Sequence, residues 1–395
     1  MISEGYAEGV NAFAVDLLSL IASDREYPGT NLLISPFSAS RCLALVSEGA
    51  SDQAKAQILD VLGGPEAVSG AASALGELLT ADGSVVFNSA DAVFFRNSLR
   101  LAEGFADGAK TRFGAWVEGL GFGNQTEAAG VMNEWIETNT GGYIKDYIVP
   151  DSITSDTLAF IANAVFFKAD WASPFDCTQT KRQPFLLSDG TLVDADMMRS
   201  EYRHLVREGE GYRNALIFYG TNKADYFYMD LYLPDEGVSI ADFIKRDLDA
   251  ALRETVARRD SFASDDGRAE DGFATGSYAY GILEMPKLSY EADTVLTEYL
   301  KTLGMTRVFN AEGNPLSRMF ADQGAFLSGV RHRAGLIADE AGTVAYAVTV
   351  AQVDGTAGPG DETLTLDRPY VFCIRAGQTG MVLFAGAVMN PSRDD

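Results

Sequence analysis

The order of helical and strand-like patterns along the chain is the feature that most restricts its fold. Apolar residues recur at helical spacing through much of the first third of the chain, as Val10, Phe13, Leu17 and Ile21 do. Apolar runs with strand character fill most of the rest. A run of helices followed by a run of strands favours separate layers over an alternating parallel sheet. The sequence therefore predicts an α+β fold with large antiparallel sheets.

Two sets of segments carry these patterns. Helical periodicity is present at 5–23, 38–47, 52–62, 67–80, 104–113, 127–139, 239–257 and 294–303. Strand character is present at 84–95, 157–167, 215–220, 226–234, 280–288, 348–353, 370–376 and 381–388. Ser35 or Ser38 is the candidate N-cap of the helix that begins near Pro36. The length of 395 residues by itself suggests two domains.

Charge and composition exclude several classes of partner and site. With 56 Asp and Glu against 31 Lys and Arg, the net charge is −25, whereas binding to nucleic-acid phosphates requires clustered cations. Three distant cysteines form neither a disulfide framework nor a metal knuckle, and His204 and His332 cannot supply a histidine-rich metal site. We therefore expect no nucleic-acid partner, no metal and no cofactor.

The sequence also lacks a membrane or export signal. No apolar run approaches the ~20 residues that a membrane helix needs, so we expect no membrane partner. The apolar stretch near the N-terminus is interrupted by Asp16 and follows no basic segment, so it does not look like a signal peptide. The compartment stays open: extracellular or cell-surface if a signal was trimmed, and cytoplasmic otherwise.

Catalytic motifs are missing from the sequence. There is no G-x-S-x-G elbow, no phosphate-binding P-loop, no H-E-x-x-H and no C-x-x-C. A Ser–His–Asp triad would have to use His204 or His332, and no local signature surrounds either residue. The sequence therefore does not favour an enzyme.

Residues 339–361, DEAGTVAYAVTVAQVDGTAGPGD, carry a two-faced pattern. One face of a strand would hold only small residues, namely Thr343, Ala345, Ala347, Thr349 and Ala351. The other face would hold the bulky residues Val344, Tyr346, Val348 and Val350, while the bulky Val353 falls out of phase. An ordinary hairpin explains the same letters, with strand 343–353, loop 354–361 and strand 363–375.

Six motifs in order indicate a more specific interpretation. They are NLLISPFSAS (31–40), VMNEWIETNTGGYIKDYI (131–148), LAFIANAVFFKADWASPFD (158–176), EMPKLSYEADTVLTEYLKTLGMTRVF (284–309), LSGVRHRAGLIADEAGTVA (327–345) and DRPYVFCIRAGQTGMVLFAGAVMNP (367–391). Through these motifs the chain resembles the serpin family of serine protease inhibitors from about residue 6 to Pro391.

The resemblance implies a single domain over 1–395, with three β-sheets, eight to nine helices and an exposed reactive-centre loop at about 340–366. It also implies suicide inhibition. The target protease cleaves the loop and forms an acyl-enzyme ester, and the freed part of the loop, residues 343–356, then inserts as a strand into the main sheet. The distorted protease cannot release the ester. The small, uncharged face of residues 343–351 suits this insertion, because a buried charge would be penalised by several kcal/mol.

The same resemblance assigns three groups of residues. The hinge of the loop comprises Glu340, Gly342, Thr343, Ala345, Ala347 and Thr349. The shutter, where the central strands part, comprises Ser35, Ser38, Asn163 and His332. The breach, at the top of the opening sheet, comprises Trp171, Lys287 and Glu340, with an ion pair between the last two. We expect Thr343 to be the first residue to enter the sheet during insertion.

The scissile bond follows from counting along the loop. Counting seventeen residues with Glu340 as the first gives Thr356–Ala357, with Val353–Asp354 and Ala357–Gly358 as alternatives. Counting back from Pro369 gives Gly358–Pro359, which is a poor substrate bond. No Lys or Arg lies between 341 and 367, so elastase-like or subtilisin-like serine proteases are favoured over trypsin-like ones. A cysteine protease of the papain class stays open as a target.

The remaining expectations concern partners and source. The helix at 67–80 contains no Lys or Arg, so we expect no heparin binding, and we expect a monomer. The 22 Arg against 9 Lys point to a GC-rich prokaryotic source. The alternative function is that of a non-inhibitory serpin with a carrier, chaperone or storage role.

Overall fold

The structure is a computed structural model, and it describes residues 2–24, 29–78, 85–155, 157–200, 204–220, 227–257, 279–322, 324–343, 363–377 and 379–392. The expected strand at 348–353, the charged stretch near 257–271 beyond Ala257, and the loop between Thr343 and Thr363 therefore lie outside the described residues.

Nine α-helices are present in the described part of the chain, which agrees with the predicted eight to nine. They are α1 (Glu4–Ala22), α2 (Pro36–Gly49), α3 (Asp52–Val61), α4 (Glu66–Leu78), α5 (Phe105–Phe113), α6 (Gln125–Asn139), α7 (Ile240–Arg246), α8 (Leu248–Ala257) and α9 (Thr297–Thr302). The start of α2 has a local cause: Ser35 is its N-cap, the Ser35 side chain accepts a hydrogen bond from the Ser38 amide, and Pro36 occupies the first turn.

The strands form a six-stranded sheet and a longer path of ten strands. The six-stranded sheet has the order β11 (Leu288–Val295), β12 (Arg331–Ala338), β13 (Gly342–Thr343), β4 (Ala159–Asp170), β2 (Val85–Arg96) and β3 (Trp116–Leu120). The longer path has the order β1 (Leu32–Ile34), β16 (Met381–Val388), β15 (Tyr370–Ala376), β9 (Phe227–Pro234), β8 (Tyr212–Tyr219), β7 (His204–Glu208), β10 (Ala279–Pro286), β6 (Leu192–Arg199) and β5 (Lys181–Leu186), with β14 (Thr363–Thr365) paired to β10.

The ten-strand path contains two sheets that share one strand. The first residues of β10 pair with β7, and its last residues pair with β6. With the six-stranded sheet this gives the three sheets that the family resemblance implies. Most neighbours are antiparallel, while β2–β3 and β10–β14 are parallel.

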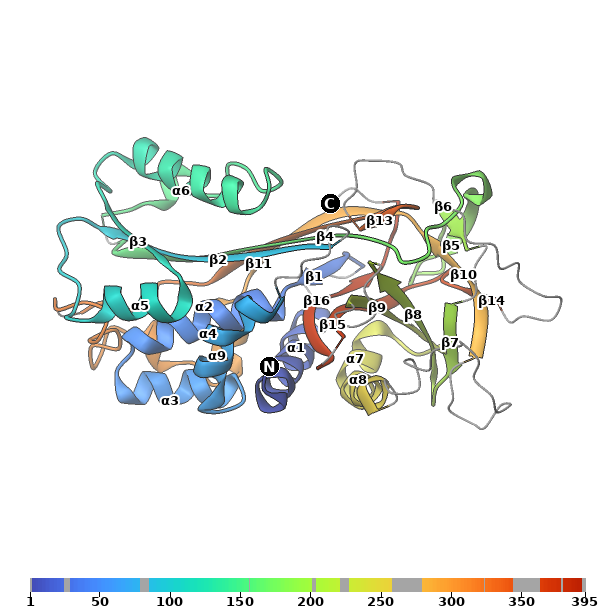
Figure 1. Ribbon diagram of the computed structural model, residues 1–395, viewed down its shortest axis with the longest axis horizontal. Helices are drawn as coiled ribbons and strands as arrows, with labels where there is room; N and C mark the ends of the chain where they lie inside the picture. The colour runs from blue at the N-terminus through green and yellow to red at the C-terminus, as the bar shows by residue number, and fades with distance from the viewer. Residues whose placement is uncertain are drawn as a thin grey trace.

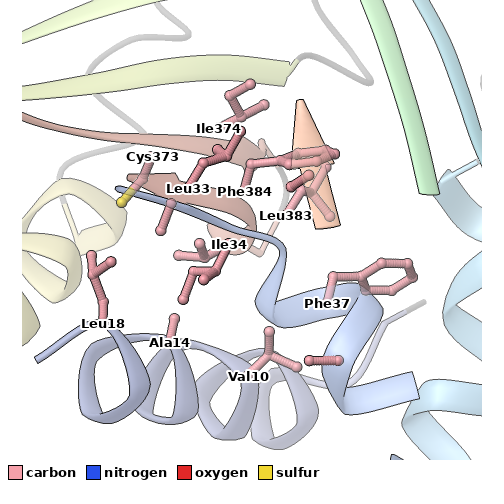
Figure 2. Close-up of a cluster of buried hydrophobic side chains, with 14 of the residues drawn as sticks. Val10, Ala14, Leu18, Leu33, Ile34, Phe37, Cys373, Ile374, Leu383 and Phe384 are labelled. Carbon is pink, nitrogen blue, oxygen red and sulfur yellow. The ribbon is translucent and has the colours of Figure 1, made fainter. Parts of the chain in front are cut away.

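The helices cover the six-stranded sheet on both faces. Figure 1 shows α6 on one side of β2, β3 and β4, and α2, α4 and α5 on the other. Beneath this sheet, α1 and α2 pack against β1, β15 and β16. Figure 2 shows Val10, Ala14 and Leu18 of α1 pointing towards Ile34, with Phe37 beside them. This core fixes α2, and α2 supports the centre of the six-stranded sheet.

Several predicted boundaries are wrong in detail. The helix predicted at 239–257 is divided into α7 and α8 at Asp247. The helix predicted at 294–303 is too long, because Thr294 and Val295 still pair with β12 as the end of β11. The strand predicted at 280–288 divides between β10 and β11 at Lys287.

Some strands carry little sequence signal, and one alternative is excluded. Strands β3, β5, β6 and β7 are short or half-exposed, so their apolar runs are weak. The ordinary-hairpin interpretation of 343–375 is wrong for the described residues. Thr343 pairs with β4 and β12, whereas Thr363–Thr365 pair in parallel with β10 and β15 begins only at Tyr370.

A fully buried ion pair fastens β15 to β9. Arg375 Nη1 donates to Asp230 Oδ2 at 2.8 Å, and both side chains have no exposed surface. Asn214 and Tyr232 also donate to the Asp230 carboxylate. The guanidinium donates further to the carbonyls of Leu252 and Gly380. One charged cluster therefore connects β8, β9 and β15 to helix α8.

We predict that Arg375→Met lowers the free energy of unfolding by about 3–5 kcal/mol, because it leaves the Asp230 carboxylate buried without its counter-ion. Arg253→Met is the matched control. Arg253 pairs with Asp249 on α8, but the two side chains are 58% and 49% exposed, so the change should stay within about 0.5 kcal/mol. Guanidinium unfolding of both variants measures the difference, and equal effects would contradict the prediction.

Candidate functional site: the gap in the six-stranded sheet

The centre of the six-stranded sheet is open between β4 and β12. Strand β13 pairs with β12 through Thr343–Ala338 and with β4 through Gly342–Asp170 and Thr343–Ala169. Below these residues, no backbone pairing joins β4 to β12 among the described strands. The sheet therefore has an unfilled position that begins where β13 ends.

Two cavities occupy this opening. One of about 240 Å³ lies beside Thr343 and is lined by 165–167 of β4 and 334–337 of β12. Another of about 350 Å³ lies further along and is lined by 159–165 of β4, by 331–333 of β12 and by the preceding Val330. Its walls also include Ser38 and Cys42 of α2, so it reaches through the sheet towards the helix beneath.

The predicted hinge residues Glu340, Gly342 and Thr343 lie in and just after a tight turn at the top of the opening. The Asp339 carboxylate accepts hydrogen bonds from the amides of Ala341 (2.9 Å) and Gly342 (3.3 Å). A Cβ at Gly342 would lie 2.2 Å from the Ala169 carbonyl oxygen, so only glycine fits between the strands. The turn thus delivers the next residue directly into the opening.

Thr343 already lies in the sheet of the intact protein. The sequence predicted that it would enter the sheet only during insertion. Its side chain is 1% exposed, and its hydroxyl shares a 2.7 Å hydrogen bond with Tyr219. Pairing to both neighbours satisfies its backbone. The other three predicted hinge residues, Ala345, Ala347 and Thr349, lie outside the described residues, as does the bond Thr356–Ala357.

The three predicted breach residues meet at the same end of the opening. Lys287 Nζ and Glu340 Oε1 are 2.8 Å apart, with side-chain exposures of 40% and 15%. Burial raises the pKa of Glu340, but hydrogen bonds from Lys287 and Thr180 outweigh it, so its pKa is below the usual value. Trp171 is buried, and its Nε1 donates to the Asp339 carbonyl at 2.8 Å. These contacts hold the hinge turn against β4.

The four predicted shutter residues also come together, beneath the larger cavity. Ser38 Oγ donates to Asn163 Oδ1 at 2.5 Å, which links α2 to β4. The Ser35 amide donates to His332 Nε2 at 2.9 Å, which links α2 to β12. The Ser35 hydroxyl donates to the Leu383 carbonyl at 2.7 Å. The N-terminus of α2 therefore holds both edges of the opening through separate hydrogen bonds.

A buried ion pair that the sequence did not reveal anchors this shutter. Asn163 Nδ2 donates to Asp91 Oδ1 at 2.7 Å and to Ser89 Oγ at 3.1 Å. Asp91 in turn pairs with Arg41 of α2, and both side chains have no exposed surface. The available signal was Asp91 itself, a charge inside the apolar run 84–95 that only a buried cation could neutralise.

These features define an α+β protein with an unfilled strand position in its central sheet, and comparisons place it in a family. The model of the family described as Serpin (serine protease inhibitor) matches residues 8–391. Serpin-ZXA of Oryza sativa subsp. japonica is 30% identical over 399 residues, which cover 96% of each chain. Serpin-Z7 of Hordeum vulgare is 28% identical over 96% of this chain and 95% of its own. The chain belongs to the serpin family.

Solved structures show the same fold. The native state of tengpin, a thermophilic serpin, matches with a TM-score of 0.83 and 23% identity, over 99% of this chain and 95% of that one. Human thyroxine-binding globulin matches with a TM-score of 0.81 and 24% identity, over 99% and 100%. Serpins are in general protease inhibitors and not enzymes, although not every serpin is inhibitory. The curated relatives named above are plant proteins, and they give no support to the predicted prokaryotic source.

Within the described residues there is neither a metal-binding cluster nor a membrane-spanning helix. No group of three or more His, Cys, Asp or Glu in the described ranges is placed to hold a metal ion. None of the helices that the structure describes is both long and apolar enough to cross a membrane.

Both histidines are buried in a state that acid would disturb. Burial lowers the pKa of His332 to about 4, and burial likewise lowers the pKa of His204 to about 4. His332 Nε2 accepts a hydrogen bond, so a proton there would break the link to Ser35. His204 stacks on Phe175 near the breach, away from the shutter.

We predict that the protein loses stability as the pH falls from about 6.5 to about 4. In this range the unfolded histidines take up protons that the folded ones exclude, so each histidine should destabilise the fold by about 2 kcal/mol between pH 7 and pH 5. His332→Gln keeps an acceptor for Ser35 and should reduce this slope by about half. Unfolding midpoints at pH 5, 6 and 7 test it, with His204→Gln as the matched variant. If the dependence of stability on pH were unchanged in His332→Gln, the prediction that His332 contributes to it would be wrong.

Proposed function

We propose that this serpin is a suicide inhibitor of serine proteases. The observation that carries the proposal is the open position between β4 and β12, with Gly342 and Thr343 already seated at its top. Fourteen residues from 343 to 356 would span roughly 46 Å as a strand. The first residue of that strand is in place, and the opening continues below it past the shutter.

The mechanism uses the loop as a substrate. The protease serine attacks the carbonyl carbon of Thr356, the peptide bond to Ala357 breaks, and the new N-terminal amine of Ala357 leaves with a proton. An ester then joins Thr356 to the protease. Insertion below Thr343 fills the open position, and the hydrogen bonds of the shutter rearrange as the strand passes Asn163 and His332. The displaced protease cannot complete ester hydrolysis.

The loop composition favours some targets over others. No cation lies between residues 341 and 367, so an acidic specificity pocket would find no partner. We therefore propose elastase-like or subtilisin-like serine proteases as targets, with papain-like cysteine proteases as a further class. We also propose a monomeric, single-domain inhibitor that acts without heparin, since 67–80 contains no Lys or Arg.

A panel of proteases tests the proposal directly. The expected result is a complex that survives SDS gel electrophoresis with at least one elastase-like or subtilisin-like enzyme. Mass spectrometry should then show that the released C-terminal peptide begins at Ala357. Cleavage of the loop by every enzyme in the panel without any stable complex would favour the non-inhibitory alternative, a carrier, chaperone or storage serpin.

We predict that Thr343→Arg turns the inhibitor into a substrate. The Thr343 side chain is 1% exposed and bonded to Tyr219, so an arginine there would be buried without a partner, at a penalty of several kcal/mol. The arginine would therefore stay out of the sheet in the intact protein, and insertion would first have to bury it. Each 1.4 kcal/mol that this burial adds to the insertion barrier slows insertion about tenfold, so that ester hydrolysis becomes faster than insertion. The measurement is the stoichiometry of inhibition, together with the protease activity that is recovered.

Val344→Arg is the matched control, because the alternation of a strand turns this residue to the outward face. Its stoichiometry of inhibition should change far less. Since Thr343 is already in the sheet, Thr343→Arg should also lower the unfolding midpoint of the intact protein. Equal loss of inhibition in both variants would contradict the two-faced pattern of the loop.

We predict that Thr356→Arg redirects inhibition towards trypsin-like proteases, since it supplies the cation that their acidic pocket binds. The rate of complex formation with trypsin should rise at least about a hundredfold over the unmodified protein. Ala357→Arg is the positional control and should give cleavage after residue 357 with poorer trapping. If Ala357→Arg traps trypsin better than Thr356→Arg does, the scissile bond is Ala357–Gly358 instead of Thr356–Ala357.

A further inference from the structure

The register of β13 fixes where each following loop residue would lie in the opening. Thr343 is paired with Ala338 of β12 and with Ala169 of β4, both antiparallel. Each step to a higher residue number on the inserted strand therefore corresponds to a step to a lower residue number on both neighbours. Three steps on, residue 346 faces Gly335 of β12 and Phe166 of β4. Residue 346 of this chain is a tyrosine.

Phe166 and Gly335 lie on the outward face of the sheet, where a tyrosine can be accommodated. Phe166 alternates with Phe167, whose ring packs inward against Tyr219. Gly335 is exposed between the buried residues Ala334 and Leu336. The outward face is also the face to which the alternation from Thr343 assigns Tyr346.

An aromatic platform borders this position. The Tyr143 ring, from the segment that follows α6, stacks on the Phe166 ring with centroids 5.1 Å apart and an angle of 19°. Tyr143 is 39% exposed, and Ile337 of β12, on the opposite side of the opening, is 36% exposed. Tyr143, Phe166, Gly335 and Ile337 all line the 240 Å³ cavity beside Thr343. Large apolar surface is thus left uncovered on both sides of an empty strand position.

The glycine makes room for the ring. Gly335 pairs with Glu291 on β11, and the Glu291 side chain borders the space above it, with Cγ 3.3 Å from where a Cβ of residue 335 would lie. A ring opposite Gly335 can lie over its backbone, as aromatic residues do across from glycine in sheets. On its other side the same ring meets Phe166 directly, at the distance where cross-strand aromatic pairs interact.

We propose that Phe166, Tyr143, Gly335 and Ile337 form a cradle for Tyr346 of the inserted loop. The inference rests on the proposed loop insertion and extends it, because it assigns a specific receptor to a bulky outward residue. Tyr346 thereby stabilises the inserted state. The small residues of the inserted loop would face the core, and this one aromatic residue would contact the outward face of the sheet.

A double-mutant cycle tests the contact in the form where it exists. The unfolding midpoint in guanidinium is measured for the intact and the loop-cleaved protein, in the unmodified chain, Tyr346→Ala, Phe166→Ala and the double variant. We expect Tyr346→Ala to destabilise the cleaved form alone, and the two changes to be non-additive there but additive in the intact form. Tyr346→Phe should behave as the unmodified protein, because the ring carries the contact.

Val350→Ala is the matched control on the same outward face. By the same register it lies opposite Ala162 and Arg331, so it should be additive with Phe166→Ala in the cleaved form. The stoichiometry of inhibition should rise about two- to fivefold in Tyr346→Ala and stay unchanged in Tyr346→Phe.

The outcomes separate this inference from the proposed function. Additive effects of Tyr346→Ala and Phe166→Ala in a cleaved form that is more stable than the intact protein would overturn the cradle and leave loop insertion standing. A cleaved unmodified protein that unfolds at the same midpoint as the intact one would overturn loop insertion itself. Coupling confined to the cleaved form supports both.

Discussion

The rest of the structure depends on two paired residues at the centre of the six-stranded sheet. Gly342 and Thr343 carry all the backbone pairing between the two halves of this sheet that the described residues contain. Below them the edges of β4 and β12 present peptide groups to cavities instead of to a neighbour. Unpaired backbone groups favour any segment that can complete the ladder. This is the position that the proposed mechanism fills with a strand from the same chain.

The open edges need support from another element, and α2 provides it. Ser38 holds Asn163 of β4, and the Ser35 amide holds His332 of β12. The buried pair of Arg41 and Asp91 fixes the helix and the Asn163 amide in one network. Such a network is rigid while all its groups are satisfied, and it weakens when one partner moves. In the proposed mechanism, this shutter would hold the strands apart and release them when the loop inserts.

The two faces of the opening differ in the charge and size of the side chains that they can accommodate. The inward side closes on Tyr219, Phe167 and the core beneath, so it admits only small, uncharged residues such as Thr343. The outward side offers Phe166 and the bare backbone of Gly335, so bulk is accepted there. The alternation of small and large residues in the loop sequence matches this asymmetry, and the proposed register would place Tyr346 beside Phe166 and Tyr143.

Sequence by itself determined the family and the α+β class, because helical and strand periods and the six motifs are local in the chain. It also predicted which residues would form a hinge, a shutter and a breach. It did not determine that Thr343 already lies in the sheet, since that depends on the distance between β4 and β12. The Arg41–Asp91 anchor also required the tertiary structure, because the two residues are 50 positions apart and only packing buries them together. The same holds for the cradle: Tyr143, Phe166 and Gly335 come from three segments whose meeting is decided by strand register.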